Sequence, residues 1–221
     1  MKKIIKKIPV IGPLAVKWKK KQRMKNFDSS EDYWKERYST GGNSGEGSYE
    51  EFAIHKAEVI NDFIEKNGIK SVIEFGSGDG NQLSYFKVDT YTGYEVSPTV
   101  VDSCNAKYNE DDSRSFFLTS DYDDRKADLT LSLDVIYCIP EEDMYAEYMK
   151  TLFAASSKYV LVFSPDIALY NENLPHLRYR VFTEWVKNNI TDFKLHSFVE
   201  NKNHEATDSP VSDFYFYEKI V

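Results

Sequence analysis

Cysteine is scarce in this sequence: Cys104 and Cys138 are the only two among 221 residues. Two thiols provide no framework of disulfide bridges, which excludes the small, disulfide-stabilised class of secreted domain. Neither cysteine lies in a spacing typical of metal ligands, so we expect no metal site. We interpret both as reduced thiols, which predicts a cytoplasmic protein.

A long apolar run is also lacking, since no stretch approaches the ~20 residues that a membrane-spanning helix needs. Pro9 and Pro13 interrupt the apolar N-terminal part and no small-residue cleavage site follows, so we expect no signal peptide. Acids are absent from residues 1–27, which hold ten Lys or Arg residues among Ile, Val, Leu and Trp18. We therefore expect a basic arm over residues 1–27 and a domain over residues 28–221. Two interpretations of the arm stay open: residues 1–25 contact the anionic inner face of a membrane, or they form a solvated tail.

The rest of the chain has a large excess of acid. Residues 28–221 carry 18 bases and all 36 acids, a net charge of −18. Such a body repels a phosphate backbone, so we do not expect DNA or RNA as the main substrate. The 16 Tyr, 14 Phe and 3 Trp residues of the chain supply a substantial core for one domain.

A glycine turn at residues 71–80 organises the chain. A short apolar strand runs into Gly76, Gly78 and Gly80, and a helical pattern follows. Backbone without side chains can approach a ligand closely, so this arrangement predicts a nucleotide pocket. Glu95 follows at the end of the next expected strand, nineteen positions after Gly76. That is close to the interval of about 20 residues at which an acid reaches ribose hydroxyls in such folds.

The exact glycine spacing separates two kinds of nucleotide site. Dinucleotide-binding proteins prefer G-x-G-x-x-G/A, and Asn81 occupies the last of those positions here. The turn is instead G-x-G-x-G, with Glu74 two residues before Gly76, and it resembles the E-x-G-x-G-x-G motif of class I S-adenosylmethionine (SAM)-dependent methyltransferases. The resemblance implies that this turn, with Ser77, lies against the methionine and ribose of SAM, while Glu95 and Val96 hold the ribose.

Alternating strand and helix patterns predict an α/β fold with a parallel sheet. We expect strands near 71–75, 91–96, 115–119, 128–133, 158–163, 194–200 and 212–220, and helices near 81–86, 98–108, 141–156 and 178–190. The resemblance implies a Rossmann-like, seven-stranded, mostly parallel sheet with helices on both faces. It also implies a C-terminal antiparallel β-hairpin that inserts residues 214–217 into the sheet.

Residues 28–67 precede the nucleotide-binding unit and contain four glycines within positions 41–47. A glycine-rich loop beside Tyr33 resembles the N-terminal lid of small-molecule methyltransferases, which implies that Tyr33 and Gly42 contact the cofactor. An ordinary linker is the alternative. Residues 48–51 match a capping box, predicting a helix that ends at Asn67 and Gly68.

Two further strand ends carry expected site residues, because ligands of open α/β sheets bind beyond the carboxyl ends of strands. The resemblance implies that Asp121 and Tyr122 contact adenine and that Leu133 meets the methionine end of SAM. Asp134 and Tyr137 are candidates for removing a proton from an acceptor hydroxyl. Many relatives have a histidine where this chain has Cys138, so a general base is not carried over to that position.

The segment at residues 175–180 holds the third catalytic candidate, His176, with Arg178 and Arg180 as candidate acceptor-binding residues. Arginine suits bidentate contact with a phosphate or carboxylate. The alternative is that these residues start a helix or pair with acids of the domain. We expect His55 and His196 to be structural or solvent-facing, and His204 to lie in a polar loop.

Together these features predict a SAM-dependent methyltransferase that acts on a hydroxyl or amine of a small molecule or glycan precursor. Two alternatives stay open: a nicotinamide-dependent oxidoreductase, and a catalytically silent subunit of the same fold that binds a partner. Neither the acceptor nor the oligomeric state follows from the sequence.

Overall fold

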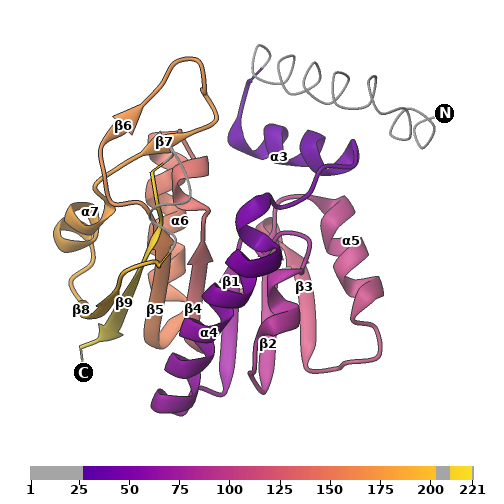
Figure 1. Cartoon of the computed structure of the whole chain (residues 1–221), viewed down its shortest axis with the longest axis vertical. Coiled ribbons are helices and arrows are strands. Elements are labelled where there is room, and N and C mark those ends of the chain that lie inside the picture. The colour runs from indigo at the N-terminus through magenta and orange to yellow at the C-terminus, as the bar shows by residue number, and fades with distance from the viewer. Residues whose placement is uncertain (1–26, 203–209, 221) are drawn as a thin grey trace.

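The computed structural model describes residues 27–202 and 210–220, and within them seven strands form one sheet in the order β3-β2-β1-β4-β5-β9-β8 (Figure 1). These are β1 (Ser71–Phe75), β2 (Thr90–Glu95), β3 (Arg114–Leu118), β4 (Ala127–Leu133), β5 (Ser156–Ser164), β8 (Phe193–Val199) and β9 (Asp213–Lys219). The first five pair in parallel, and β9 lies antiparallel between β5 and β8. This confirms the expected Rossmann-like sheet and the strand inserted near its C-terminal end.

The described residues form five α-helices: α3 (Ser30–Ser39), α4 (Glu50–Asn67), α5 (Pro98–Lys107), α6 (Glu142–Ala154) and α7 (Phe182–Asn189). Four of them cover the two faces of this sheet, while α3 lies across its end (Figure 1). One core joins α4 and α5 to the sheet, and a second core joins α6 and α7 to its other face. Alternation along β4 produces this division: Leu129 and Leu131 pack in the first core, whereas the Oγ1 of Thr130 donates to the carbonyl of Leu152 on α6 at 2.9 Å.

The prediction of a helix near residues 81–86 is wrong, because only a short 3-10 helix, η2 (Gln82–Tyr85), follows the glycine turn. Side chains at its start bond to the N-terminal region: Nδ2 of Asn81 donates to the carbonyl of Ser48 at 2.7 Å, and Nε2 of Gln82 donates to Ala53 at 2.9 Å. Phe86 then adopts extended backbone angles. Tertiary hydrogen bonds replace the longer helix that the apolar spacing suggested.

The capping box at residues 48–51 is also wrong. Ser48 ends a 3-10 helix, η1 (Glu46–Ser48), and α4 begins after Tyr49 without a side-chain cap. The expected end of α4 is confirmed: Gly68 has a φ of 61°, and its N–H bonds to carbonyls of the last helical turn. Glycine adopts this left-handed conformation without the steric cost of a Cβ atom.

The helix expected from residue 178 starts four residues later, at Phe182. Arg178 and Tyr179 instead form β7 (Arg178–Tyr179), which pairs antiparallel with β6 (Leu169–Tyr170) in a separate two-stranded sheet. The carboxylate of Asp166 accepts hydrogen bonds from the N–H and hydroxyl of Thr183, at 3.0 and 2.6 Å. A carboxylate that accepts hydrogen bonds from the first turn stabilises the start of a helix. Asp166 therefore helps to place the beginning of α7 at Phe182.

The basic arm expected at residues 1–27 lies, apart from Phe27, outside the described residues, as does His204. Among the helices that the structure does describe, none combines the length and apolar character required to cross a membrane.

Candidate cofactor and acceptor site

A cavity of about 920 Å³ lies at the carboxyl ends of the parallel strands. The glycine turn after β1 and the end of β2 line one part of it, including Gly76, Ser77, Gly78, Glu95 and Val96. The other part is lined by α3, the start of α4, the segment after β4 and the chain leading into β7 and β9. This is the edge of the sheet where open α/β folds bind their ligands.

The three glycines of the turn are required by backbone conformation. Gly76, Gly78 and Gly80 have φ angles of 76°, 57° and 67°, a region that residues with a side chain rarely adopt. Packing adds a second reason, because a Cβ atom on Gly76 or Gly78 would lie closer than 3.0 Å to Val135 or Ser44, respectively. The turn therefore holds a shape that brings backbone without side chains to the edge of the cavity.

Glu95 points into this turn. Its Oε2 accepts a hydrogen bond from the N–H of Gly78 at 3.1 Å, and its Oε1 accepts from Val96 and Ser97 at 2.8 and 3.3 Å. The carboxyl is 5% exposed, and burial raises its pKa while the three backbone N–H groups offset part of that rise. A carboxylate offers about four acceptor positions, so these bonds fix its orientation and leave capacity for a ligand hydroxyl.

Glu74 also lines the cavity but is bound to the sheet. Its Oε2 accepts a hydrogen bond from the hydroxyl of Tyr91 at 2.6 Å, and the residue is 2% exposed. Burial raises the pKa of Glu74 to about 7, against the lowering effects of the Tyr91 bond and the Lys56 charge. Glu74 therefore supports the floor of the turn.

The glycine-rich loop after α3 is fastened to the glycine turn through Asp79. The Asp79 carboxylate accepts from the N–H of Ser44 at 3.1 Å and from the hydroxyl of Tyr49, while the N–H of Asp79 donates to Ser44 Oγ at 2.9 Å. The hydroxyl of Tyr38 lies 3.2 Å from the same Ser44 oxygen. These contacts hold the loop over the cofactor half of the cavity.

Of the residues expected near adenine, only one lines the cavity. The Tyr122 ring makes edge contacts with Phe75 and Tyr94, at centroid distances of 5.4 and 5.3 Å, and its hydroxyl donates to Arg125. Asp121 is exposed and does not line the cavity, because its side chain sits on the outside of the 3-10 turn Thr119–Asp121. Thr119 and Ser120 line this end instead.

Asp134 is the centre of a polar cluster in the acceptor half of the cavity. Its Oδ2 lies 3.1 Å from Nζ of Lys56, and its Oδ1 accepts from Ser212 at 2.6 Å and from Tyr137 at 3.3 Å. The Asp134 backbone has a φ of 60°, which orients this carboxylate between α4 and β9. With both oxygens engaged, Asp134 is suited to positioning rather than to taking a proton.

Lys56 and Ser212 were not among the residues expected in the site. Lys56 is 3% exposed, and its ammonium lies 5.2 Å from the centre of the Phe163 ring. A signal was present, since Lys56 lies four residues from both Phe52 and Ile60 on the apolar face of α4. A lysine in that position needs a buried partner. No local pattern marked Ser212.

His176 belongs to the segment that leads into β7. It lines the cavity, is 8% exposed, and its ring packs against Tyr33 at a centroid distance of 4.6 Å. Tyr137 stacks on Tyr179 at 5.1 Å. Burial, followed by the Asp134 charge, raises the pKa of Tyr137 well above its usual value, so its hydroxyl acts as a hydrogen-bond donor.

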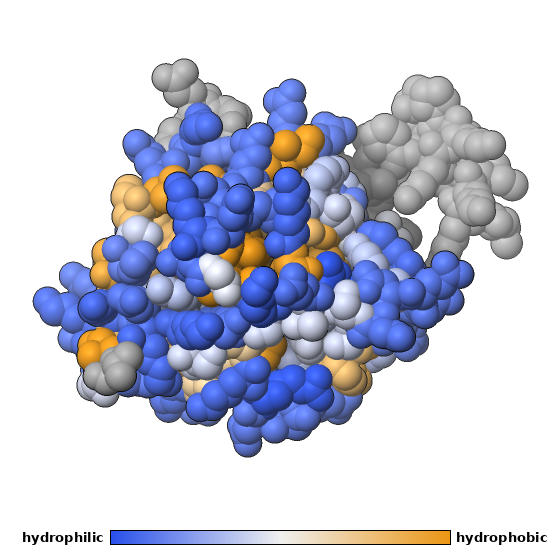
Figure 2. Space-filling view, turned by 90° about the horizontal axis from the view of Figure 1, so that it is seen from below, coloured by the Kyte–Doolittle hydropathy of each residue, from blue (hydrophilic) through white to orange (hydrophobic). Residues whose placement is uncertain are grey.

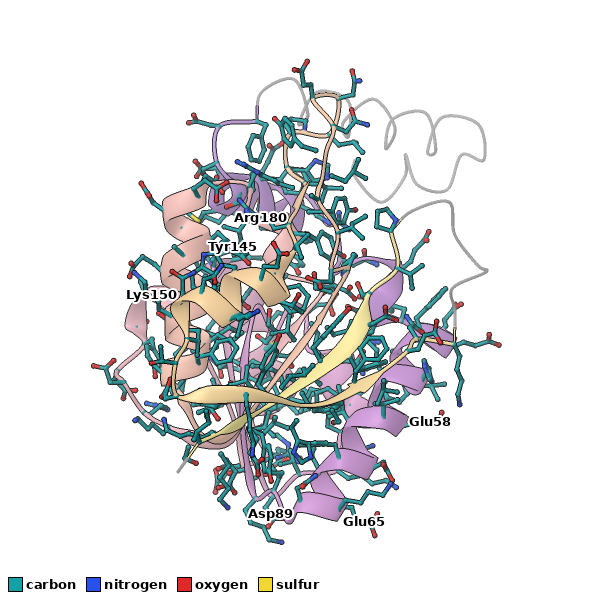
Figure 3. All side chains as sticks on the ribbon, turned by 90° about the vertical axis from the view of Figure 1, so that its left-hand side faces the viewer. Glu58, Glu65, Asp89, Tyr145, Lys150 and Arg180 are labelled. Carbon is teal, nitrogen blue, oxygen red and sulfur yellow. The ribbon has the colours of Figure 1, made fainter. Side chains whose placement is uncertain are left out.

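Besides Asp121, four residues expected at the site do not line the cavity. Arg180 donates to the carbonyls of Ile139 and Pro140, and its guanidinium lies 4.2 Å from the centre of the Tyr145 ring (Figure 3). Arg178 pairs with Glu142 at 2.6 Å. These contacts correct the expectation that the two arginines bind the acceptor, since they join β7 to α6. Gly42 packs against Arg37, also away from the cavity, and Gly80 lies behind the turn against Cys104.

Across residues 27–202 and 210–220, no group of three or more His, Cys, Asp or Glu side chains is arranged to hold a metal ion. The polar groups at the cavity are single carboxylates, hydroxyls, imidazoles and one buried ammonium. Such a set can bind a nucleoside and exchange protons with an acceptor.

No family model matches the chain, and no curated protein matches it in sequence. Solved structures match its fold. Magnesium protoporphyrin IX methyltransferase from Synechocystis PCC 6803, with bound SAM, has a TM-score of 0.61 and 12% identity, covering 88% of this chain and 99% of that one. The methyltransferase domain of bacterial CtHen1 has a TM-score of 0.60 and 16% identity, covering 76% and 98%. The 1,6-didemethyltoxoflavin-N1-methyltransferase of Burkholderia thailandensis, with bound S-adenosylhomocysteine, has a TM-score of 0.59 and 15% identity, covering 78% and 80%. The chain therefore has the fold of the class I SAM-dependent methyltransferases.

Proposed function

We propose that this protein is a SAM-dependent methyltransferase that acts on a hydroxyl or amine of a small molecule or glycan precursor. The observation that carries the proposal is the hydrogen bond between the Glu95 carboxylate and the N–H of Gly78. It joins the acid at the end of β2 to the glycine turn after β1, beside a cavity large enough for a nucleoside and an acceptor. Solved structures with this fold contain SAM or S-adenosylhomocysteine.

The same geometry disfavours a nicotinamide cofactor. Dinucleotide-binding turns need a small third residue so that a helix can pack closely on the sheet. Here Asn81 occupies that position, its amide bonds to Ser48, and a 3-10 helix of four residues replaces the usual helix. A silent, partner-binding subunit would not need buried polar groups around a cavity, but only a binding measurement separates that alternative.

Bound SAM supplies an electrophilic methyl group, so the protein's main tasks are placement and proton removal. Glu95 would hold the ribose beside the glycine turn, with Leu133 and the backbone after β4 at the methionine end. The loop fastened by Asp79 would cover this half. Holding an acceptor in line contributes a large part of the rate through proximity and orientation.

A hydroxyl acceptor must also lose its proton, and His176 is the best-placed group to take it. An imidazole nitrogen of His176 would accept that proton in the acceptor half, while Asp134, held by Lys56 and Ser212, orients the surrounding hydroxyls. Positioned bases of this kind contribute about 10²–10⁴-fold in rate. An unprotonated amine would need no base before transfer.

The fold alone does not select the acceptor. The named acceptors of its structural neighbours include a porphyrin and a toxoflavin precursor, and one neighbour is a small RNA methyltransferase. The net charge of −18 over residues 28–221 opposes an RNA backbone and favours a small acceptor. We place the protein in the cytoplasm, with residues 1–25 contacting the inner face of the membrane.

Titration calorimetry with SAM, S-adenosylhomocysteine and NAD tests the proposal. We expect SAM and S-adenosylhomocysteine to bind and NAD not to bind. Binding of NAD alone would support the oxidoreductase, and binding of none of the three would support the silent subunit. Soaking crystals with SAM and locating density beside its methyl group would then identify the acceptor side.

A further inference from the structure

The β6–β7 hairpin, residues 166–180, projects from the end of the molecule that contains the cavity (Figure 1). Its strands pair Leu169 with Tyr179 and Tyr170 with Arg178. The connecting loop is internally hydrogen-bonded, with the N–H of Leu174 donating to Asn171 at 2.8 Å and that of Leu177 to Leu174 at 2.9 Å. The hairpin is therefore an ordered projection, held by its strand pairing and by hydrogen bonds within its loop.

Four large apolar side chains are exposed on the outer surface of the hairpin, next to the polar tip residues 171–173. Ile167, Leu169, Tyr170 and Leu174 are 42, 46, 55 and 36% exposed, four large apolar side chains within eight residues. The opposite end of the molecule, seen from below in Figure 2, is covered mainly by hydrophilic residues. A concentration of exposed apolar groups on one projection marks a contact surface, because water offers no favourable interaction there.

Charge distinguishes which kind of partner fits this surface. The hairpin is formally neutral, with Asp166 and Glu172 balanced by Arg178 and Arg180, and both arginines pair with Glu142. The described chain begins at Phe27, whose ring lies 6.4 Å from that of Tyr33, which packs against His176 of the hairpin. Ten Lys and Arg residues precede Phe27 in the sequence, so a strongly basic segment joins the domain beside an apolar projection.

From this juxtaposition we propose that the β6–β7 hairpin inserts into the headgroup–acyl boundary of an anionic membrane. Apolar side chains and Tyr170 suit that boundary, and basic residues nearby are attracted by anionic lipid. The domain as a whole has a large excess of acid, which disfavours a uniform approach to the same surface.

If the proposed methyltransferase function holds, this orientation also determines where the acceptor enters. Leu177 and Tyr179 of the hairpin also line the acceptor half of the cavity. An acceptor would then enter at the lipid interface, which identifies its class as an amphiphile held at the membrane surface rather than a freely diffusing metabolite.

Vesicle sedimentation with the full chain tests the surface. The probes are phosphatidylcholine vesicles with and without phosphatidylglycerol. The test variant is Leu169→Ser with Tyr170→Ser. The control is Leu195→Ser with Phe198→Ser on β8, whose side chains are equally exposed at 52 and 50%. We expect the wild type to bind vesicles that contain phosphatidylglycerol, the test variant to bind about tenfold more weakly or less, and the control to match the wild type.

SAM affinity and thermal unfolding of each variant, measured in parallel, verify that it is folded. A second variant, Ile167→Ser with Leu174→Ser, repeats the test should the first be unstable. Absence of wild-type vesicle binding, or binding by both hairpin variants that equals that of the wild type, would overturn the proposal. So would a concentration-dependent dimer that the hairpin substitutions dissociate, since the surface would then bind a second copy of the chain. Vesicle binding without SAM binding would refute the proposed function while leaving the membrane surface intact.

Discussion

At the scale of single residues, the site is defined by three carboxylates in different environments, two of them buried and one partly buried. Glu95 is held by three backbone N–H groups and faces the cavity, whereas Glu74 is held by one tyrosine hydroxyl under the turn. Asp134 is engaged by an ammonium and two hydroxyls. Because the donors differ, we propose different tasks for the three acids: ligand binding, support of the turn, and orientation of the acceptor half.

Replacing Glu95 with Gln tests the ribose contact with little change of shape. Loss of a charged hydrogen-bond partner is expected to weaken SAM binding by about 1.5–3 kcal/mol, as measured by titration calorimetry. Asp121→Asn is the matched control, since Asp121 does not line the cavity. Unchanged SAM affinity in the Glu95 variant, or an equal loss in the control, would contradict the assignment.

The raised pKa of Glu74 predicts that the free energy of unfolding depends on pH. Its folded pKa of about 7 is above the ordinary value of 4.5, so the folded state binds more protons than the unfolded chain between those values. Stability from this group is therefore present below pH 4.5 and is lost as pH rises to about 7, by roughly 3 kcal/mol. The difference between wild-type and Glu74→Gln unfolding curves across this range isolates the effect. A difference that does not vary with pH would exclude it.

His176 predicts a separation of binding from turnover. His176→Asn should leave SAM affinity unchanged and lower kcat by about 10²–10⁴-fold on a hydroxyl acceptor. The rate of the variant should rise with pH where the acceptor ionises by itself. If the substitution abolishes SAM binding, His176 belongs to the cofactor half instead.

At the scale of elements, the site depends on how the N-terminal segment meets the glycine turn. The loop between α3 and α4 bonds to Asp79, and the carbonyl of Ser48 accepts from Asn81. The turn therefore has the loop as one of its packing partners. Ordering a glycine-rich loop costs conformational entropy, and these hydrogen bonds offset that cost.

Substituting two glycines with nearly equal φ angles distinguishes the effect of backbone strain from the effect of packing. Gly78 and Gly68 have φ angles of 57° and 61°, but a Cβ on Gly78 would collide with Ser44, while one on Gly68 meets no atom within 4 Å. Gly68→Ala should cost about 1–2 kcal/mol of stability and leave SAM affinity unchanged. Gly78→Ala should cost the same strain and also displace the loop, lowering SAM affinity by about tenfold or more. Equal effects on SAM binding would show that the loop does not support the turn.

At the scale of the whole molecule, charge is divided along the chain. Ten bases precede Phe27, and a net charge of −18 follows residue 27. The two parts respond oppositely to an anionic surface, which orients the molecule instead of attracting it uniformly.

A chain that starts at Phe27 tests this division. Each basic residue near an anionic membrane contributes about 1 kcal/mol, so the shortened chain should lose most of its binding to phosphatidylglycerol vesicles. Raising the salt concentration should weaken binding of the full chain and hardly affect the shortened one. Equal sedimentation of the two chains at low salt would show that the N-terminal residues are a solvated tail.

The sequence by itself determined where the strands lie along the chain, the glycine turn, and the position of Glu95 at the end of a strand. These follow from local rules: apolar runs bounded by turns, glycines where φ is positive, and an acid at a fixed interval along a βαβ unit. The sequence also contained a signal at Lys56 that our prediction of the site did not use: a charged residue on an apolar helix face indicates a buried partner.

Only the tertiary structure decided which polar residues share the cavity. Asp134 and Ser212 are 78 residues apart, and their contact depends on β9 lying beside β5. Arg178 and Arg180 do not line the cavity. Arg178 pairs with Glu142, and Arg180 donates to two carbonyls of the chain before α6. The expected helix after the turn shortened for the same reason, since bonds to the N-terminal segment replaced it. Contacts between distant segments depend on the completed packing, and no periodicity within one segment records them.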